Sequence, residues 1–272
     1  MKLISLFVIG VLSGTVLAQD PAGALKSPAR MNSGADPIFA VATIKPSDPN
    51  LPGYGAHITP GQFSATSYTL QLLIIYAYDL HRSQVFGGPA WLDSDKYNIV
   101  AKPDGEGQPS TAEWKIMLQK LLADRFGLTF HRETRTLSVY ALTVAKSGPK
   151  LTPAGEDSDD AVGDISFSEL GKLQARHASV ADFVHSMQRN VLDRPIIDQT
   201  GLSGRYDFAL SWVPDEFQFS AVRTPGGPQM PNNTEGADLV TAVREQLGLQ
   251  LKATRAPAKV IVIDHAERPS DN

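Results

Sequence analysis

The sequence predicts an α+β protein made of two tandem copies of a small unit, in which helices pack on an antiparallel sheet. Two observations lead to this prediction. Similar blocks of sequence recur in the same order at a nearly constant spacing. Segments with period-two alternation of apolar and polar residues alternate with amphipathic helical segments. The composition fits this fold, because 42% hydrophobic and 20% charged residues in a 272-residue chain are typical of one or two globular domains.

Three blocks carry the internal repeat. In the first of them, Gly-Gln-Phe-Ser-Ala at 61–65 returns as Gly-Lys-Leu-Gln-Ala at 171–175. Ordered matches at similar offsets are hard to obtain by chance, so we infer a duplication from them. The matched segments are 61–65 with 171–175 at an offset of 110, 95–99 with 204–208 at 109, and 126–130 with 247–251 at 121, the last continuing to 139–142 with 260–263.

Each copy is expected to contain a strand, a helix, two strands, a second helix and two final strands. In the first copy, Thr69 is the expected N-cap, because apolar residues follow from Leu70 at i, i+3, i+4 and i+7. Ser110 and Glu113 have the spacing of a capping box and start the second helix. Gly127 is the expected end of that helix, since glycine readily adopts the left-handed conformation there.

The second copy has corresponding signals. Ser179 and Asp182 repeat the cap pattern, and the last helix is expected over 238–247 with Gly248 as its end. Apolar and polar residues alternate along 206–212. A strand with one polar face suggests an antiparallel sheet that helices cover on the other face.

The first eighteen residues have the pattern of a secretory signal peptide. Lys2 is a short positive region, residues 3–11 form an apolar core, and residues 16–18, Val-Leu-Ala, form a cleavage site of the small-x-small type. An uncleaved anchor helix is the alternative, but the apolar run is shorter than the roughly 20 residues that span a bilayer. We therefore expect cleavage after Ala18 and an exported protein, periplasmic or secreted, with no transmembrane helix in the mature chain.

The remaining chain divides by composition. A stretch rich in Pro, Ala, Gly and Ser precedes the first unit and is typical of a flexible lead. An acidic stretch separates the units; calcium binding there is the alternative to a solvated linker, but the order of an EF-hand loop is absent. The expected divisions are the signal peptide 1–18, the lead 19–36, repeat unit 1 at 37–151, the acidic linker 152–164, and repeat unit 2 at 165–272 with a mobile insertion at 214–236.

Charge and cysteine content exclude several classes of function. A net charge of −4 argues against a nucleic-acid partner, which usually requires a basic surface. The absence of cysteine excludes disulfides, thiolate metal sites and a cysteine nucleophile. The motifs HExxH, G-x-S-x-G, GxGxxG after a strand and the Walker A loop are also missing. We therefore assign no catalytic, cofactor-binding or metal-ligating residue, and no cofactor.

Three pairs of residues come nearest to a site. His131 and Glu133, at i and i+2 on a strand, share one face and could ligate a metal or exchange a proton. The favoured interpretation is a solvated polar strand. The other two pairs are Asp182 with His185, which is typical of a surface helix pair, and Asp264 with His265, whose side chains should diverge on a strand.

A resemblance to a known family rests on the blocks 39–46, 87–92, 121–126, 146–151, 198–206 and 245–249. These blocks resemble one family of exported proteins that is abundant in soil acidobacteria and is known as a domain of unknown function. The resemblance covers roughly residues 37–270 and implies no catalytic set. Related domains are sometimes fused to a membrane metallopeptidase sensor of the beta-lactam-receptor type. The layout of each repeat is also similar to short N-terminal domains of secretins and TonB-dependent receptors.

Three hypotheses for function follow. The leading one is a non-enzymatic binding or interaction module in the periplasm or outside the cell, with an envelope protein as the expected partner and an unknown ligand. The second is an extracytoplasmic sensor that works with a separate membrane protein. The third is an envelope-directed hydrolase with a site between the repeats. Enzymatic activity is left open and is not favoured.

Overall fold

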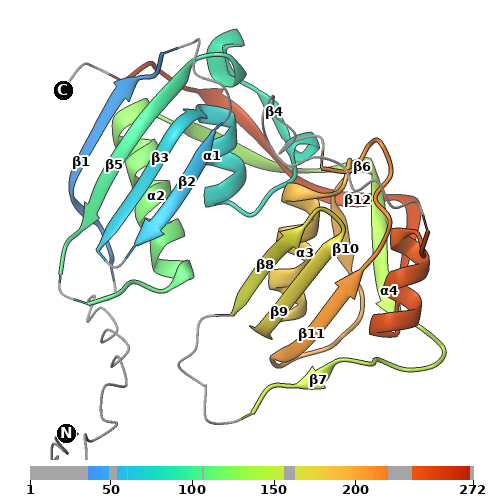
Figure 1. Cartoon of the computed structure of the whole chain (residues 1–272). Coiled ribbons are helices and arrows are strands. Elements are labelled where there is room, and N and C mark those ends of the chain that lie inside the picture. Colours follow the sequence, from blue (N-terminus) through green and yellow to red (C-terminus); the bar gives the residue numbers. More distant parts are fainter. Residues whose placement is uncertain are drawn as a thin grey trace, which may run out of the picture.

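The described part of the chain is mixed α+β, with four α-helices and three four-stranded sheets that are mostly antiparallel (Figure 1). This confirms the α+β part of the predicted fold class. The predicted signal peptide, nearly all of the lead, the centre of the acidic linker and most of the insertion lie outside the described residues. The computed structural model describes residues 36–48, 54–59, 61–105, 107–155, 163–219 and 235–269.

The first lobe is a sheet in the order β1-β5-β3-β2, with α1 and α2 packed on one face (Figure 1). Thr69 caps α1 and Ser110 caps α2 through a capping box with Glu113, as predicted. Buried side chains of both helices and of the sheet form one core. The elements are β1 (Phe39–Pro46), β2 (Gly55–Thr59), β3 (Gln62–Thr69), α1 (Leu70–Ala77), the 3-10 turns Arg82–Gln84 and Ala90–Asp93, β5 (Lys96–Pro103) and α2 (Thr111–Phe126).

The second lobe has the sheet order β7-β11-β9-β8, with α3 and α4 contributing to a separate core. Ser179 and Asp182 form the predicted capping box of α3, and Asp238 caps α4. Gly127 and Gly248 end α2 and α4 with φ angles of 55° and 63°, as predicted. The elements are β7 (Thr152–Pro153), β8 (Asp164–Glu169), β9 (Lys172–Ala178), α3 (Val180–Asn190), β11 (Tyr206–Ser211) and α4 (Leu239–Leu247).

A third sheet, in the order β10-β6-β12-β4, joins the two lobes. Its centre is a ribbon of two long antiparallel strands, and the short outer strands pair with it in parallel. Strand β12 starts in the second lobe, where Leu249 is in the core, and ends in the first, where Ile263 is. The elements are β4 (Val85–Gly87), β6 (Thr129–Val144), β10 (Ile196–Asp198) and β12 (Leu249–His265).

This ribbon differs from the expectation that each copy ends in two strands. Each pair is one uninterrupted strand, β6 or β12. The reason is that the middle of the ribbon is exposed, so Thr134, Thr136 and Ser138 give it the composition of a loop. Continuous pairing from Phe130 to Val144 satisfies the hydrogen-bonding groups of the backbone where the side chains bury little surface.

The lobes share an irregular feature at one position of their sheets. Ser67 and His177 have positive φ angles of 56° and 48° and lie at bulges between the two inner strands. Their backbone N–H groups donate to the side chains of Asn98 (3.0 Å) and Asp207 (2.6 Å). A left-handed conformation is costly for a residue other than glycine, and in both lobes a side-chain oxygen compensates for it.

Candidate functional site

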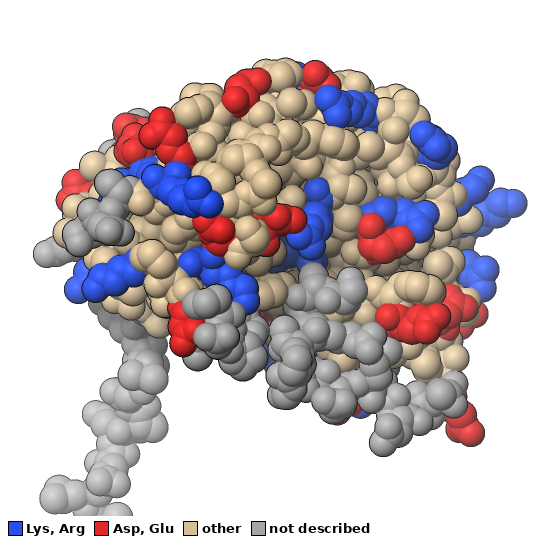
Figure 2. All heavy atoms as spheres, turned by 90° about the horizontal axis from the view of Figure 1, so that it is seen from above, with Lys and Arg blue, Asp and Glu red and all other residues tan. Residues whose placement is uncertain are grey.

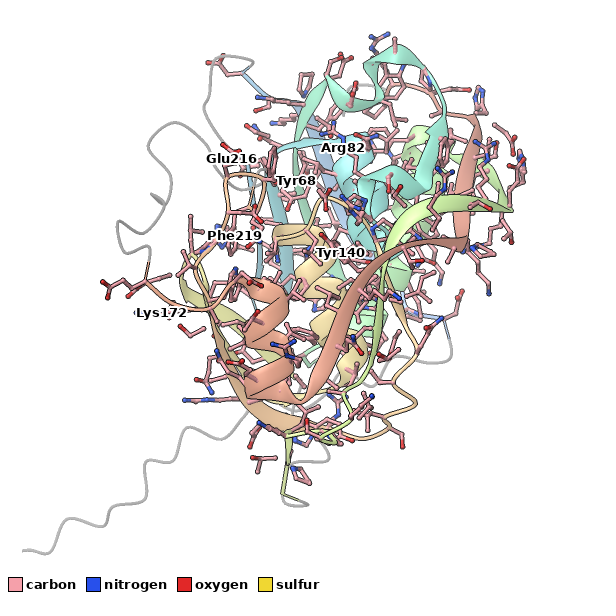
Figure 3. All side chains as sticks on the ribbon, turned by 90° about the vertical axis from the view of Figure 1, so that its right-hand side faces the viewer. Tyr68, Arg82, Tyr140, Lys172, Glu216 and Phe219 are labelled. Carbon is pink, nitrogen blue, oxygen red and sulfur yellow. The ribbon has the colours of Figure 1, made fainter. Side chains whose placement is uncertain are left out.

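A pocket of about 320 Å³ opens in the second lobe, between the end of α3, the start of α4 and the ribbon. Its polar side is formed by Asp193, Arg194 and Tyr140. Leu192 and Leu251 form a buried apolar floor. Figure 3 shows Tyr140 on the long strand β6 and Phe219 at the end of the segment that follows β11. The pocket therefore combines an apolar base with a charged and aromatic wall.

The pocket adjoins a short helix. Helix α4 has 9 residues and α2 has 16, and both end at a left-handed glycine. In the first lobe, the additional N-terminal turns of α2 include Trp114, which is 2% exposed and packs on Phe63. In the second lobe, Phe219 stacks on Trp212 with ring centroids 5.8 Å apart, while Val240 in the first turn of α4 lines the pocket.

The charged wall is fixed by one ion pair. Arg194 donates from Nε to Asp193 at 3.0 Å and from a terminal nitrogen at 2.5 Å. These hydrogen bonds lower the pKa of the Asp193 carboxyl and raise the pKa of Arg194. The guanidinium also lies 5.1 Å from the centroid of the Tyr140 ring. Burial raises the pKa of Tyr140, so its phenol is neutral at physiological pH. The wall thus presents an anion, a cation and a neutral hydroxyl.

Two further carboxylates line the pocket, but both have structural partners. Asp215 accepts hydrogen bonds from the backbone of Phe217 and Gln218, and Asp238 caps α4 by accepting from the backbone of Thr241. Phe217 is 69% exposed at the same pocket. An exposed aromatic ring beside a partly apolar pocket is typical of a binding surface.

The ionisable groups in the described lining of the pocket are Asp193, Asp215, Asp238, Arg194 and Tyr140. Among its described lining residues there is no histidine, serine, threonine or lysine that could pair as base and nucleophile. No group of three or more His, Asp or Glu side chains in the described residues is arranged to hold a metal ion.

His131 and Glu133 do come together, and the register of the ribbon adds Asp264. His131 Nδ1 lies 2.8 Å from Asp264 Oδ1, and its Nε2 lies 3.1 Å from Glu133 Oε1. The carboxylates contact opposite nitrogens of the ring, so the three groups do not converge on one ion. On β6 they lie on the face opposite Tyr140, by strand alternation. The expectation of a polar, solvated strand accounts for this cluster.

This cluster gives a titration prediction. Hydrogen bonds with Glu133 and then Asp264 raise the pKa of His131 above that of an unstructured histidine. Its stabilising contribution is therefore present below the unfolded pKa and is lost as pH rises through the folded one. We expect Glu133→Gln to lower the His131 pKa toward the ordinary value, measured from ring NMR shifts. His57 is the internal control, and an unchanged His131 pKa would contradict the assignment.

In the described structure, no hydrogen bond or ion pair joins the two residues of either of the other predicted pairs. Asp182 belongs to the α3 capping box, and His185 lies 3.5 Å from Asp79 of the first lobe. Asp182 acts on His185 only through its charge, which favours a higher pKa against the larger effect of burial. The Asp182 carboxylate bonds to the N-terminus of α3 rather than to His185, because there it satisfies a backbone N–H group that has no partner within the helix. Asp264 and His265 diverge as predicted, since His265 lies 2.7 Å from Glu267.

Sequence reasoning missed a polar contact between the lobes. Asp79, which follows α1, pairs with Lys115 at 2.6 Å and lies 3.5 Å from His185 on α3. The Asp79 carbonyl also accepts a hydrogen bond from Gln188 at 3.0 Å. Burial lowers the pKa of His185, so the ring is neutral at neutral pH. No local sequence pattern indicates this contact, because its residues are separated by up to 109 positions in the chain.

Charges are interspersed on the surface seen from above. Figure 2 shows acidic and basic side chains mixed on this face rather than gathered by sign. Within the described chain, no helix has the length and apolar character needed to cross a bilayer.

Comparison with known protein families gives a match. The family model described as "Protein of unknown function (DUF3738)" matches residues 71–266. No curated protein and no solved structure matches the chain. The match begins at the second residue of α1 and extends over the ribbon and the whole described second lobe, including every residue named above for the pocket.

Proposed function

The chain belongs to this family of proteins of unknown function, and we propose that it is an exported, non-enzymatic binding protein produced by tandem duplication. In this proposal the second lobe holds a small amphipathic ligand in the pocket beside Arg194. The signal-peptide pattern of residues 1–18 supports export. The observation that carries the binding role is the pocket itself, with its apolar floor and polar wall.

Contacts within the third sheet support the duplication. Val85 of β4 pairs with Ile261, and Ile196 of β10 pairs with Tyr140. Ile261 follows Tyr140 by the offset of 121 that aligns the ends of the two copies in sequence. In the ribbon, Thr136 pairs with Pro257, a residue 121 positions further along. An approximate two-fold axis between Thr136 and Pro257 would relate the two lobes. The pocket in the second lobe would then be a feature in which one copy differs from the other.

The nature of the lining supports an amphipathic ligand. Leu192, Leu239 and Leu251 would bury its apolar part, which is the main source of affinity in such sites. Arg194 and the Tyr140 hydroxyl would orient its polar part. The ion pair with Asp193 holds the guanidinium in place before binding, so little side-chain entropy is lost when the ligand docks.

Fluorescence of Trp212 offers a test, because its Nε1 donates to Gln218 at 2.7 Å and Gln218 lines the pocket. We expect members of a fragment library of small amphipathic molecules to change this emission. Val240→Phe should fill the mouth and weaken their binding about tenfold, since it adds bulk where the ligand would lie. Val100→Phe is the matched control: the two valines are 45% and 43% exposed, and only Val240 lines the pocket.

Two outcomes would overturn the proposal. If both substitutions weaken fragment binding equally, or if neither weakens it, the fragments bind outside this pocket. Chemical conversion of a bound fragment, detected by mass spectrometry, would contradict the non-enzymatic role. Trp212→Phe should abolish the change in fluorescence on fragment binding. This control verifies that the change comes from the tryptophan beside the pocket.

A further inference from the structure

Aromatic and cationic side chains meet where the two lobes touch, outside the pocket described above. Arg189, in the last turn of α3, lies over the ring of Tyr76 from α1, with its central carbon 5.4 Å from the ring centroid. Beside them, Tyr54 and Tyr68 contact edge to face, with centroids 5.3 Å apart. Tyr68, labelled in Figure 3, is at the end of β3. The first lobe therefore supplies three phenols, and the second lobe supplies one guanidinium.

The positive charge of Arg189 is not balanced within the described residues. No carboxylate among them lies within ion-pair distance of its guanidinium. Arg194, five positions further along, is instead held by two hydrogen bonds to Asp193. The Arg189 side chain is exposed, so an external group can reach it.

The phenols around Arg189 are uncharged. Burial raises the pKa of Tyr54, Tyr68 and Tyr76, and brings that of Tyr68 to about 12. The positive charge of Arg189 lies close enough to the three rings to oppose this effect, because it favours a lower pKa for each phenol. A neutral phenol can donate to an anion without charge repulsion.

We propose that Arg189, Tyr54, Tyr68 and Tyr76 form a second binding site, which takes an acidic sugar at the junction of the lobes. The planar guanidinium would bind the oxyanion through two parallel hydrogen bonds. The tyrosine rings would contact the apolar face of the sugar, and the hydroxyls of Tyr68 and Tyr76 would bind its ring hydroxyls. The oxyanion is a carboxylate or a phosphate, which share this chemistry.

The site uses both lobes, because Arg189 comes from the second lobe and the phenols come from the first. Arg82 of the first lobe also acts on the pKa of Tyr54, but its guanidinium pairs with Asp93 at 3.5 Å. Gln188, next to Arg189, donates to the backbone of Asp79, and this contact fixes the end of α3 against the first lobe. A ligand bound here would bridge the lobes and add to that contact.

Isothermal titration of the mature chain, residues 19–272, with glucuronate, glucose 6-phosphate and glucose tests the proposal. We expect the two anions to bind and glucose to bind at least about tenfold more weakly, because charge-assisted hydrogen bonds are lost. Arg189→Gln should remove the preference for the anions. Arg132→Gln is the matched control, since Arg132 also lies over a tyrosine, Tyr78, at 5.9 Å.

The outcomes separate the alternatives. Binding of glucuronate alone, or of glucose 6-phosphate alone, identifies the oxyanion and supports the site. Equal binding of all three sugars, no binding of either anion, or equal losses in both arginine variants would overturn it. Thermal unfolding of Arg189→Gln shows whether the fold is intact, and Arg189→Lys, which keeps the charge without the planar fork, should bind more weakly than the parent. Val240→Phe should leave this binding unchanged, so the two sites fail independently.

Discussion

Replacing Gly248 by alanine is expected to destabilise the protein by about 3 kcal/mol or more, from left-handed strain and backbone overlap together. Gly248 ends α4 with a φ angle of 63°. A Cβ built there would lie 2.0 Å from the carbonyl oxygen of Gly148 and 2.9 Å from the Lys150 nitrogen. Both atoms belong to backbone, which cannot rotate away as a side chain can. The free energy of unfolding in urea is the measurement.

Gly127→Ala is the matched control for this prediction. Gly127 ends α2 with a φ angle of 55°, and a Cβ there would meet nothing closer than 3.7 Å. We expect a loss of about 1–2 kcal/mol, from the left-handed conformation alone. Equal losses in the two variants would show that the approach of the 148–150 backbone to α4 is looser than the contacts indicate.

Trp114→Ala is expected to lower the free energy of unfolding by about 3–5 kcal/mol, the usual range for removing a large aromatic side chain from a core. Trp114 is 2% exposed in the first-lobe core. Its ring lies 6.0 Å from that of Phe39 and 6.5 Å from that of Phe63. Deleting the ring therefore leaves a cavity between α2 and the sheet.

Trp114→Phe separates packing from hydrogen bonding at this position. The indole Nε1 is buried without a hydrogen-bond partner among the described residues. Phenylalanine removes that unsatisfied donor while keeping most of the ring, so we expect a loss of less than about 2 kcal/mol. A loss as large as that of Trp114→Ala would mean that the indole nitrogen is satisfied, by a bound water for example.

The helix boundaries were predictable from the sequence because their causes are local. Ser110 with Glu113, and Ser179 with Asp182, form the capping boxes that their spacing predicts. A side chain that satisfies a free backbone N–H three residues away needs no partner from the rest of the chain. The length of β6 was not predictable, because its middle is stabilised by pairing with β12, more than a hundred residues away.

The candidate site was largely hidden from sequence reasoning. The pocket draws Tyr140 from a strand, Arg194 from a loop after α3, and Val240 from α4. None of these residues belongs to a recognisable motif. The one signal available was the i, i+2 spacing of His131 and Glu133, which locates an exposed cluster and not the pocket.

The sequence by itself determined the α+β class, the capped and glycine-ended helices, and the absence of cysteine chemistry. Each of these depends on composition or on groups a few residues apart. Only the tertiary structure decided that β6 and β12 cross between the lobes, that His185 lies beside Asp79, and that a pocket opens beside α4. These features arise from pairing and packing between distant segments, whose energies depend on the whole fold and leave no local pattern in the chain.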